Sequence, residues 1–109
     1  MLNDWEAIQH IKLLQDIAYK VWGDNCTFGE IIEVESMYPA FDLPVKLYGK
    51  YNVKLEYEAS TVGIYILLSG RYVGLSRIIS DVYKGFKSMY PENLEHNFRL
   101  LDRVLKQME

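Results

Sequence analysis

Residues 45–58 alternate between apolar and polar side chains, which is the pattern of a β-strand with one buried face. The apolar side chains fall on every second position, with Gly49 as the gap in the series: Val45, Leu47, Tyr51, Val53, Leu55 and Tyr57. A two-residue turn at Gly49 and Lys50 would pair Leu47 with Asn52 and place apolar against polar side chains. The alternation therefore predicts one long strand over 45–58, bent or bulged at Gly49.

Two further strand-like segments follow and agree with the first on which side chains are buried. Tight turns at 60–61 and at 69–70 bring the three segments into antiparallel register. Under this pairing the apolar residues share one face of the sheet: Val53, Leu55, Tyr57, Ile64, Ile66, Leu68, Val73 and Leu75. The sequence therefore predicts a three-stranded antiparallel meander over about 45–58, 62–68 and 71–75.

The residues before the meander contain one clear helix and one ambiguous segment. Apolar side chains recur at helical spacing after Asn3 and Glu6, which have the spacing of a capping box, and Gly23 is suited to end the helix. In segment 27–38 a second capping-box spacing favours a helix, whereas the alternation in its middle favours a strand. We interpret this segment as a helix, followed by a loop over 39–44.

Two C-terminal helices are predicted after the meander. The first begins at Ser76 or Ser80, and the second begins at Pro91, a residue that fits the first turn of a helix. The final helix carries an apolar stripe: Leu94, Phe98, Leu101, Leu105 and Met108. Helices around an antiparallel meander predict a single compact α+β domain over residues 1–109.

Composition and charge are typical of a globular protein and give no indication of a membrane protein or a nucleic-acid-binding protein. The chain of 109 residues is 50% hydrophobic and 25% charged, which is typical of a globular domain with a real core. Its net charge of −3 does not indicate a polyanionic partner. Polar residues interrupt the N-terminus, and the longest apolar run, 64–68, is too short to span a bilayer, so we expect no signal peptide and no membrane association. The single cysteine, Cys26, fits a cytoplasmic location.

Residue types that carry catalysis are few and scattered. His10 and His96 fall on predicted helices, and only Glu92 and His96, four residues apart, have a spacing that occurs in metal sites. We interpret this pair as an ordinary contact on a helix surface. Cys26 lies in an apolar context and is interpreted as a core residue. We therefore predict a non-catalytic protein with no metal site and no cofactor. A small enzyme whose site combines dispersed residues, such as His10, Cys26, Glu30 and His96, remains an alternative.

The second face of the predicted sheet mixes aromatic rings with charges. Its side chains are the predicted partner-binding residues: Tyr48, Lys54, Glu56, Tyr65, Leu67 and Tyr72. If a helix covers this face, these residues form a second core layer. If the face is open, aromatic anchors inside a polar rim are typical of a protein-binding surface. The favoured hypothesis is a protein-binding module, such as an inhibitor of the toxin-immunity or anti-defence type, or an adaptor.

Two other uses of the same sheet remain open. The tyrosines and the basic residues Lys46, Lys50, Lys54 and Arg71 would suit stacking on single-stranded RNA or DNA, although Glu56 and Glu58 work against it. The long first strand is predicted to be a sheet edge, through which a homodimer would form by strand pairing.

Overall fold

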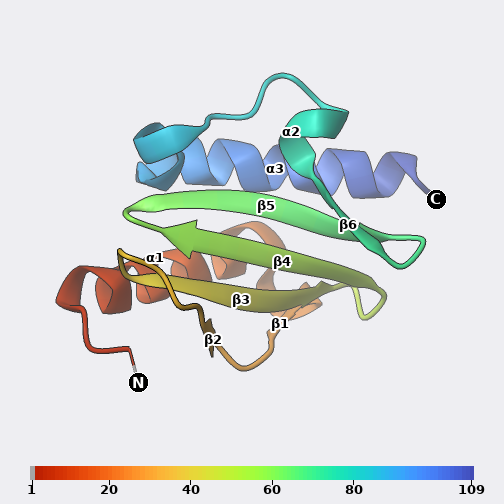
Figure 1. Cartoon of the computed structure of the whole chain (residues 1–109). Coiled ribbons are helices and arrows are strands. Elements are labelled where there is room, and N and C mark those ends of the chain that lie inside the picture. The colour runs from red at the N-terminus through yellow and green to blue at the C-terminus, as the bar shows by residue number, and fades with distance from the viewer. Residues whose placement is uncertain (1) are drawn as a thin grey trace.

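The computed structural model describes residues 2–109, which form one antiparallel sheet flanked by helices (Figure 1). The strands are β1 (Cys26–Phe28), β2 (Ile32–Glu33), β3 (Ala40–Leu47), β4 (Tyr51–Glu58), β5 (Thr61–Leu68) and β6 (Arg71–Gly74). Their order is β1-β3-β4-β5-β6, and β2 also pairs with β3. The helical elements are α1 (Trp5–Trp22), η1 (Gly23–Asn25), α2 (Leu75–Ile78), η2 (Gly85–Met89) and α3 (Pro91–Gln107). The predicted α+β class is confirmed, but the sheet contains more strands than the three predicted.

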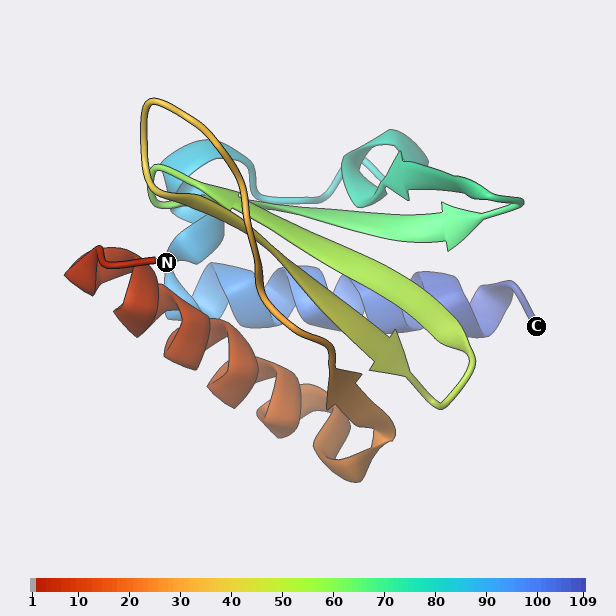
Figure 2. The ribbon, with the colours of Figure 1, turned by 60° about the horizontal axis from the view of Figure 1, so that its bottom comes forward.

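The core lies between one face of the sheet and the two long helices. Helices α1 and α3 contact each other and lie on the same side of the sheet (Figures 1 and 2). The inner face of β3, β4 and β5 is buried against them: Phe41, Leu43, Val45, Leu47, Val53, Leu55, Tyr57, Val62, Ile64 and Ile66. The predicted inner face of the meander is therefore confirmed, with Leu68 and Val73 half-buried at its margin.

Both long helices begin and end for reasons visible in the sequence. The Asp4 carboxylate accepts a hydrogen bond of 2.9 Å from the Ala7 N–H and caps α1, one residue after the predicted cap at Asn3. Gly23 ends α1 with a φ of 55°, a value that favours glycine. Pro91 occupies the first turn of α3, as predicted.

The prediction of a single strand over 45–58 is wrong, because the chain reverses at Gly49. Tyr48 and Gly49 have positive φ values of 56° and 69°, and the Lys50 N–H donates to the Leu47 carbonyl at 3.1 Å. This connection has three residues instead of two, so Leu47 pairs with Tyr51 rather than with Asn52. One extra residue restores apolar-to-apolar register along the whole hairpin. As a result, β4 lies at the centre of the sheet and is not an edge.

The helix predicted over 27–38 is also wrong. Strands β1 and β2 replace it and pair end to end with β3, so that Thr27 faces Lys46 and Ile32 faces Asp42. The segment forms strands because its backbone can hydrogen-bond to β3, whereas a short isolated helix would gain no such tertiary contacts.

The loop predicted over 39–44 is instead the first half of β3, although it contains Pro44. The Pro44 carbonyl accepts from the Gly29 N–H at 2.9 Å, in the gap between β1 and β2. The amide and carbonyl of one strand residue point to the same side, so the missing N–H of Pro44 faces this gap and not β4. The proline therefore interrupts no hydrogen bond between β3 and β4.

The turn between β4 and β5 lies one residue earlier than predicted. Ala59 and Ser60 form it with positive φ values of 49° and 64°, and Tyr57 therefore pairs with Val62. The pairing shifts by two residues, which leaves the same side chains on the inner face. The predicted turn at 69–70 is confirmed, since Leu68 pairs with Arg71.

The helix predicted to begin at Ser76 or Ser80 is wrong as a continuous element. The chain forms the single turn α2, then an extended stretch over 79–84, then η2. The Asn97 side chain of α3 holds this stretch: its oxygen accepts from the Tyr83 N–H and its nitrogen donates to the Tyr83 carbonyl, both at 3.0 Å. Such a two-point contact substitutes for a strand pairing and is incompatible with a helix at Tyr83.

The edge of β5 that faces away from β4 is bonded by β6 along one part and by η2 along another. Strand β6 pairs only with residues 65–68 of β5. Nearer the start of β5, the buried Ser88 hydroxyl of η2 accepts a hydrogen bond of 2.9 Å from the Val62 N–H and donates to the Gly85 carbonyl. A side chain therefore satisfies an edge amide that β6 does not reach.

Candidate functional site

The face of the sheet opposite α1 and α3, here called the outer face, is covered by neither of these two helices, and its residues are half-buried or exposed (Figures 1 and 2). Side-chain alternation along β3 to β6 assigns to this face Asp42, Lys46, Lys54, Glu56, Glu58, Gly63, Tyr65, Leu67, Tyr72 and Gly74. The alternative of a second core layer under a helix is therefore not realised.

Five of the six predicted partner-binding residues share the outer face: Lys54, Glu56, Tyr65, Leu67 and Tyr72. Tyr48 does not, because it lies in the β3–β4 turn and its hydroxyl donates to the Asp102 carboxylate on α3. The placement of Tyr48 was wrong because it assumed an unbroken strand through Gly49.

The Tyr65 ring lies across the strands on the outer face, in space left by two glycines. A Cβ added to Gly63 would lie 2.9 Å from Cε2 of the ring, and one added to Gly74, the cross-strand partner, would lie 3.4 Å from Cε1. A side chain at Gly63 would crowd the ring out of this pose, whereas one at Gly74 would meet the ring at an ordinary contact distance. The absence of a side chain at Gly63 therefore allows the Tyr65 ring to take this orientation.

Lys54 joins two other outer-face residues. Its ammonium lies 2.9 Å from the Glu56 carboxylate and 4.4 Å from the centre of the Tyr72 ring. The hydrogen bond to Glu56 raises the pKa of Lys54 above its ordinary value, so the ammonium stays charged. The ring of Tyr72, which is 42% exposed, is held against this cation and presents an aromatic surface to solvent.

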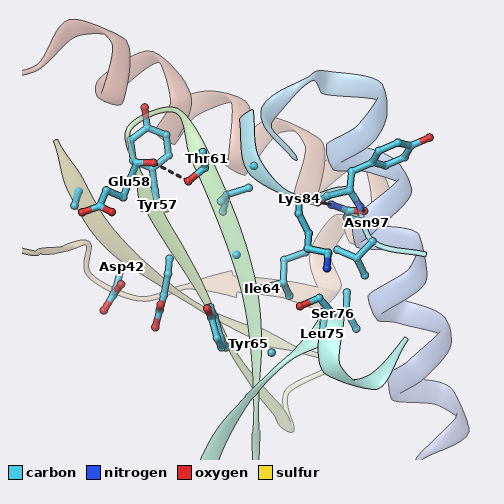
Figure 3. Close-up of a pocket in the computed structure, with 18 of the residues that line it drawn as sticks. Asp42, Tyr57, Glu58, Thr61, Ile64, Tyr65, Leu75, Ser76, Lys84 and Asn97 are labelled. Atoms are coloured by element: carbon cyan, nitrogen blue, oxygen red, sulfur yellow. Dashed lines mark hydrogen bonds between the residues drawn. The ribbon is translucent and has the colours of Figure 1, made fainter. Parts of the chain in front are cut away.

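A groove of about 440 Å³ lies beside Tyr65, between the outer face and the stretch over 82–85 (Figure 3). The sheet wall carries three carboxylates: Asp42, Glu56 and Glu58. The opposite wall carries Ser76 and Lys84, and Figure 3 shows them across the cavity from Asp42 and Glu58. The groove is therefore acidic on one side, with a single lysine on the other.

Contacts with α3 fix the groove wall over 82–85 and the residue before it, Asp81. In addition to the two hydrogen bonds between Asn97 and Tyr83, Nε2 of His96 lies 2.9 Å from the Asp81 carbonyl. The His96 and Tyr83 rings also meet edge to face, with centroids 5.1 Å apart. These contacts hold the wall without a helix or strand of its own.

Asp42 differs from the other two carboxylates of the groove because its side chain makes no hydrogen bond or salt bridge within residues 2–109. Glu56 binds Lys54, and Glu58 accepts a hydrogen bond from the Ser36 hydroxyl. The half-buried Asp42 side chain makes no hydrogen bond or ion pair within residues 2–109, and its cross-strand neighbour is Glu56. Burial and the nearby charge of Glu56 raise the pKa of Asp42 above its ordinary value, and Lys54 offsets only part of this effect.

The dispersed residues considered for an enzyme site lie in separate environments. Nδ1 of His10 lies 2.6 Å from the Tyr57 hydroxyl, whereas the buried Cys26 thiol donates to the Gly23 carbonyl at 3.3 Å. Burial and the Asp24 charge raise the pKa of Cys26. No hydrogen bond, ion pair or ring contact among residues 2–109 joins two members of this set: His10, Cys26, Glu30 and His96. Within the same residues, no three histidine, cysteine or acidic side chains gather closely enough to hold a metal ion.

No protein family model, curated protein or solved structure matches this chain. Its site is therefore defined by geometry alone. In the part of the chain that the structure describes, every helix is too short or too polar to cross a membrane.

Several residues of the groove were not identified from the sequence. Asp42 lies in the loop predicted over 39–44, although Phe41 and Leu43 continue the alternation of the next residues and indicate that Asp42 belongs to the outer face. Lys84 was assigned to a helix. Its position opposite the sheet depends on Asn97, a contact between distant segments that no local pattern reveals.

Proposed function

We propose that this protein is a non-catalytic protein-binding module that binds its partner on the outer face of the sheet. The observation that carries the proposal is the position of α1 and α3 on the inner face, which leaves an aromatic sheet surface open. Leu67 and Tyr72 are cross-strand neighbours on that surface, and Tyr65 lies next to Leu67 along the same face of β5. An apolar and aromatic centre with charged neighbours is the arrangement found in protein interfaces.

Preorganisation of the tyrosines supports the same proposal. Gly63 and Gly74 give the Tyr65 ring its position, and Lys54 holds the Tyr72 ring. Side chains that are already ordered lose less conformational freedom when a partner binds, so more of the contact energy appears as affinity. A module of this kind acts by occupying its partner's surface, as an inhibitor of the toxin-immunity or anti-defence type does, or by linking two proteins as an adaptor.

Single-stranded nucleic acid is a less suitable partner for this face. Asp42, Glu56 and Glu58 line the groove and would repel phosphates. Two of the basic residues that could bind phosphates form salt bridges within the protein, Lys54 with Glu56 and Lys50 with Glu109.

The test is site-specific photo-crosslinking in the native host. A benzophenone amino acid replaces Leu67 on the outer face, and a control protein carries it at Tyr19, an exposed position on α1. We expect a defined protein adduct from position 67 and none of the same mass from position 19. An adduct with nucleic acid, or the same adducts from both positions, would contradict the proposal.

Two matched tyrosines then test the contribution of the aromatic surface. Tyr72 and Tyr90 have similar exposed fractions, 42% and 44%, but Tyr90 lies at the end of η2 and not on a strand of the outer face. Loss of an anchor at the centre of an interface typically costs about 2 kcal/mol or more, so Tyr72→Ala should weaken binding of the crosslinked partner about thirtyfold. Tyr90→Ala should leave the affinity within about twofold. The opposite ranking would exclude the outer face as the interface.

A further inference from the structure

The groove beside Tyr65 is lined mainly by acidic side chains among its charged residues. We propose that the partner inserts a basic side chain, arginine or lysine, between Asp42 and Glu56 and over the Tyr65 ring. This inference rests on the proposed function, because it assumes that a protein binds the outer face. It adds to that function a cation-binding position with named residues.

Charge complementarity favours a cation. Three carboxylates and one ammonium line the groove, which gives it a net formal charge of −2. Lys54 forms a salt bridge with Glu56, whereas it attracts Asp42 without forming a salt bridge with it. A basic side chain would find an attractive field on the sheet wall, whereas an acidic side chain would find only Lys84 on the opposite wall.

Asp42 and Glu56 are poorly explained by folding alone. Like charges directly opposite each other on a sheet destabilise the folded protein. Lys54 forms a salt bridge with Glu56, but the half-buried Asp42 side chain makes no hydrogen bond or salt bridge within residues 2–109. Positions that lower stability in this way are expected where binding requires them. A cation from the partner, placed between the two carboxylates, would turn their repulsion into an attraction that stabilises the complex.

The shape of the site suits arginine in particular. The Tyr65 ring lies across the strands, since Gly63 and Gly74 leave room beneath it. A guanidinium is planar, stacks on aromatic faces and binds a carboxylate through two parallel hydrogen bonds. The groove volume of about 440 Å³ exceeds that of one side chain, so it also admits the adjoining backbone of an extended peptide.

The direct test is a titration of the isotope-labelled, full-length protein with a blocked tripeptide, acetyl-Gly-Arg-Gly-amide, observed by amide NMR. We expect saturable shifts of the Gly63 and Gly74 amide signals. Replacing arginine by citrulline keeps the shape but removes the charge, and should weaken binding about tenfold or more. A tripeptide with glutamate at the centre should cause no saturable shift at these amides.

Three variants assign the interaction to named groups. Asp42→Asn should weaken binding of the arginine tripeptide about tenfold, because it removes the carboxylate that has no internal partner. Lys84→Gln should strengthen it about twofold, because it removes a like charge across the groove. Asp16→Asn, on the exposed surface of α1, should leave it unchanged. The dispersion of the amide signals reports in each case whether the variant is folded.

The inference is overturned by any of three results: no saturable shift with the arginine tripeptide, equal affinity for the citrulline tripeptide, or tighter binding of the glutamate tripeptide. The protein-binding proposal has a separate outcome, because crosslinking from position 67 does not depend on Asp42. If a partner is crosslinked at position 67 but the arginine tripeptide does not bind, the protein-binding proposal stands and the proposal of a basic side chain in the groove is wrong.

Discussion

Asp102 and Asp42 are half-buried carboxylates on opposite sides of the same sheet, and their surroundings differ completely. Asp102, on the helix side, accepts hydrogen bonds from Nε1 of Trp22 at 3.0 Å and from the Tyr48 hydroxyl, and it pairs with Lys106 at 3.0 Å. These contacts join the end of α1, the β3–β4 turn and α3. Asp42, on the outer face, has no such partner.

The two carboxylates consequently have pKa shifts of opposite direction. Burial alone would raise the pKa of Asp102, but the hydrogen bonds from Tyr48, Lys106 and Trp22 outweigh it and hold the pKa below its ordinary value. Burial and Glu56 raise the pKa of Asp42. The inner carboxylate therefore stabilises the fold in its ionised form, whereas the outer one destabilises it. The difference separates a carboxylate that is hydrogen-bonded within the chain from one that makes no hydrogen bond or salt bridge among residues 2–109.

The largest expected difference between the two faces comes from truncating one leucine on each. Leu55→Ala, on the fully buried inner face, should lower the free energy of unfolding by about 2 to 5 kcal/mol. Leu67→Ala, on the outer face, should lower it by about 1 kcal/mol, because the side chain is only half-buried. Urea unfolding monitored by circular dichroism measures both. Equal losses would mean that the outer face is packed as a second core.

Asp102→Asn should lower the free energy of unfolding by about 1 to 3 kcal/mol at neutral pH, because Trp22, Tyr48 and Lys106 lose a charged acceptor. A lowered pKa contributes stability above the ordinary pKa, and that contribution disappears as the pH falls through the folded-state pKa. The difference between wild type and variant should therefore shrink on acidification. The control is Asp16→Asn, whose exposed pair with Lys12 should contribute less than about 1 kcal/mol.

Gly63→Ala should lower the free energy of unfolding by about 1 kcal/mol, because the new methyl group would meet the Tyr65 ring at 2.9 Å. Gly74→Ala places a methyl group at an ordinary contact distance of 3.4 Å and should cost less. Thermal unfolding ranks the two variants, and the ring signals of Tyr65 in NMR spectra should move more in Gly63→Ala. A larger effect at Gly74 would show that the ring does not rest mainly on Gly63.

The smallest expected effect is a gain in stability. Asp42→Asn should raise the free energy of unfolding by about 0.5 kcal/mol at neutral pH, because it removes a like charge opposite Glu56. The wild type gains stability when Asp42 is protonated, so the advantage of the variant should be absent below about pH 4 and should grow as the pH rises through the raised pKa. Urea titrations at several pH values measure it. Destabilisation at neutral pH would mean that Asp42 has a stabilising role.

The fold was predictable from the sequence wherever a local pattern was reinforced by packing. The apolar stripes of α1 and α3 and the inner face of the meander follow directly from hydrophobic periodicity. Register was the weak point. A hairpin with a two-residue turn at Gly49 and Lys50 would pair apolar with polar side chains, whereas a three-residue connection at 48–50 pairs apolar with apolar side chains. The alternation of side chains alone does not show how many residues the turn contains.

The candidate site was predictable only in part, for a related reason. Lys54, Glu56, Tyr65, Leu67 and Tyr72 share a face by simple alternation and were found. The wall over 82–85 depends on Asn97, which is 14 positions from Tyr83 and buried beneath it. Pairings of this kind are set by tertiary packing, so sequence patterns within one element do not contain them.

The hydrogen bond between Ser88 and the Val62 amide has a consequence for the behaviour of the protein in concentrated solution. An unsatisfied strand edge is a template on which other chains can add, and it leads to aggregation. The hydroxyl occupies one edge donor, and η2 stands where an incoming strand would lie. Ser88 therefore opposes the addition of another strand at the start of β5, and with it the growth of fibres from this edge.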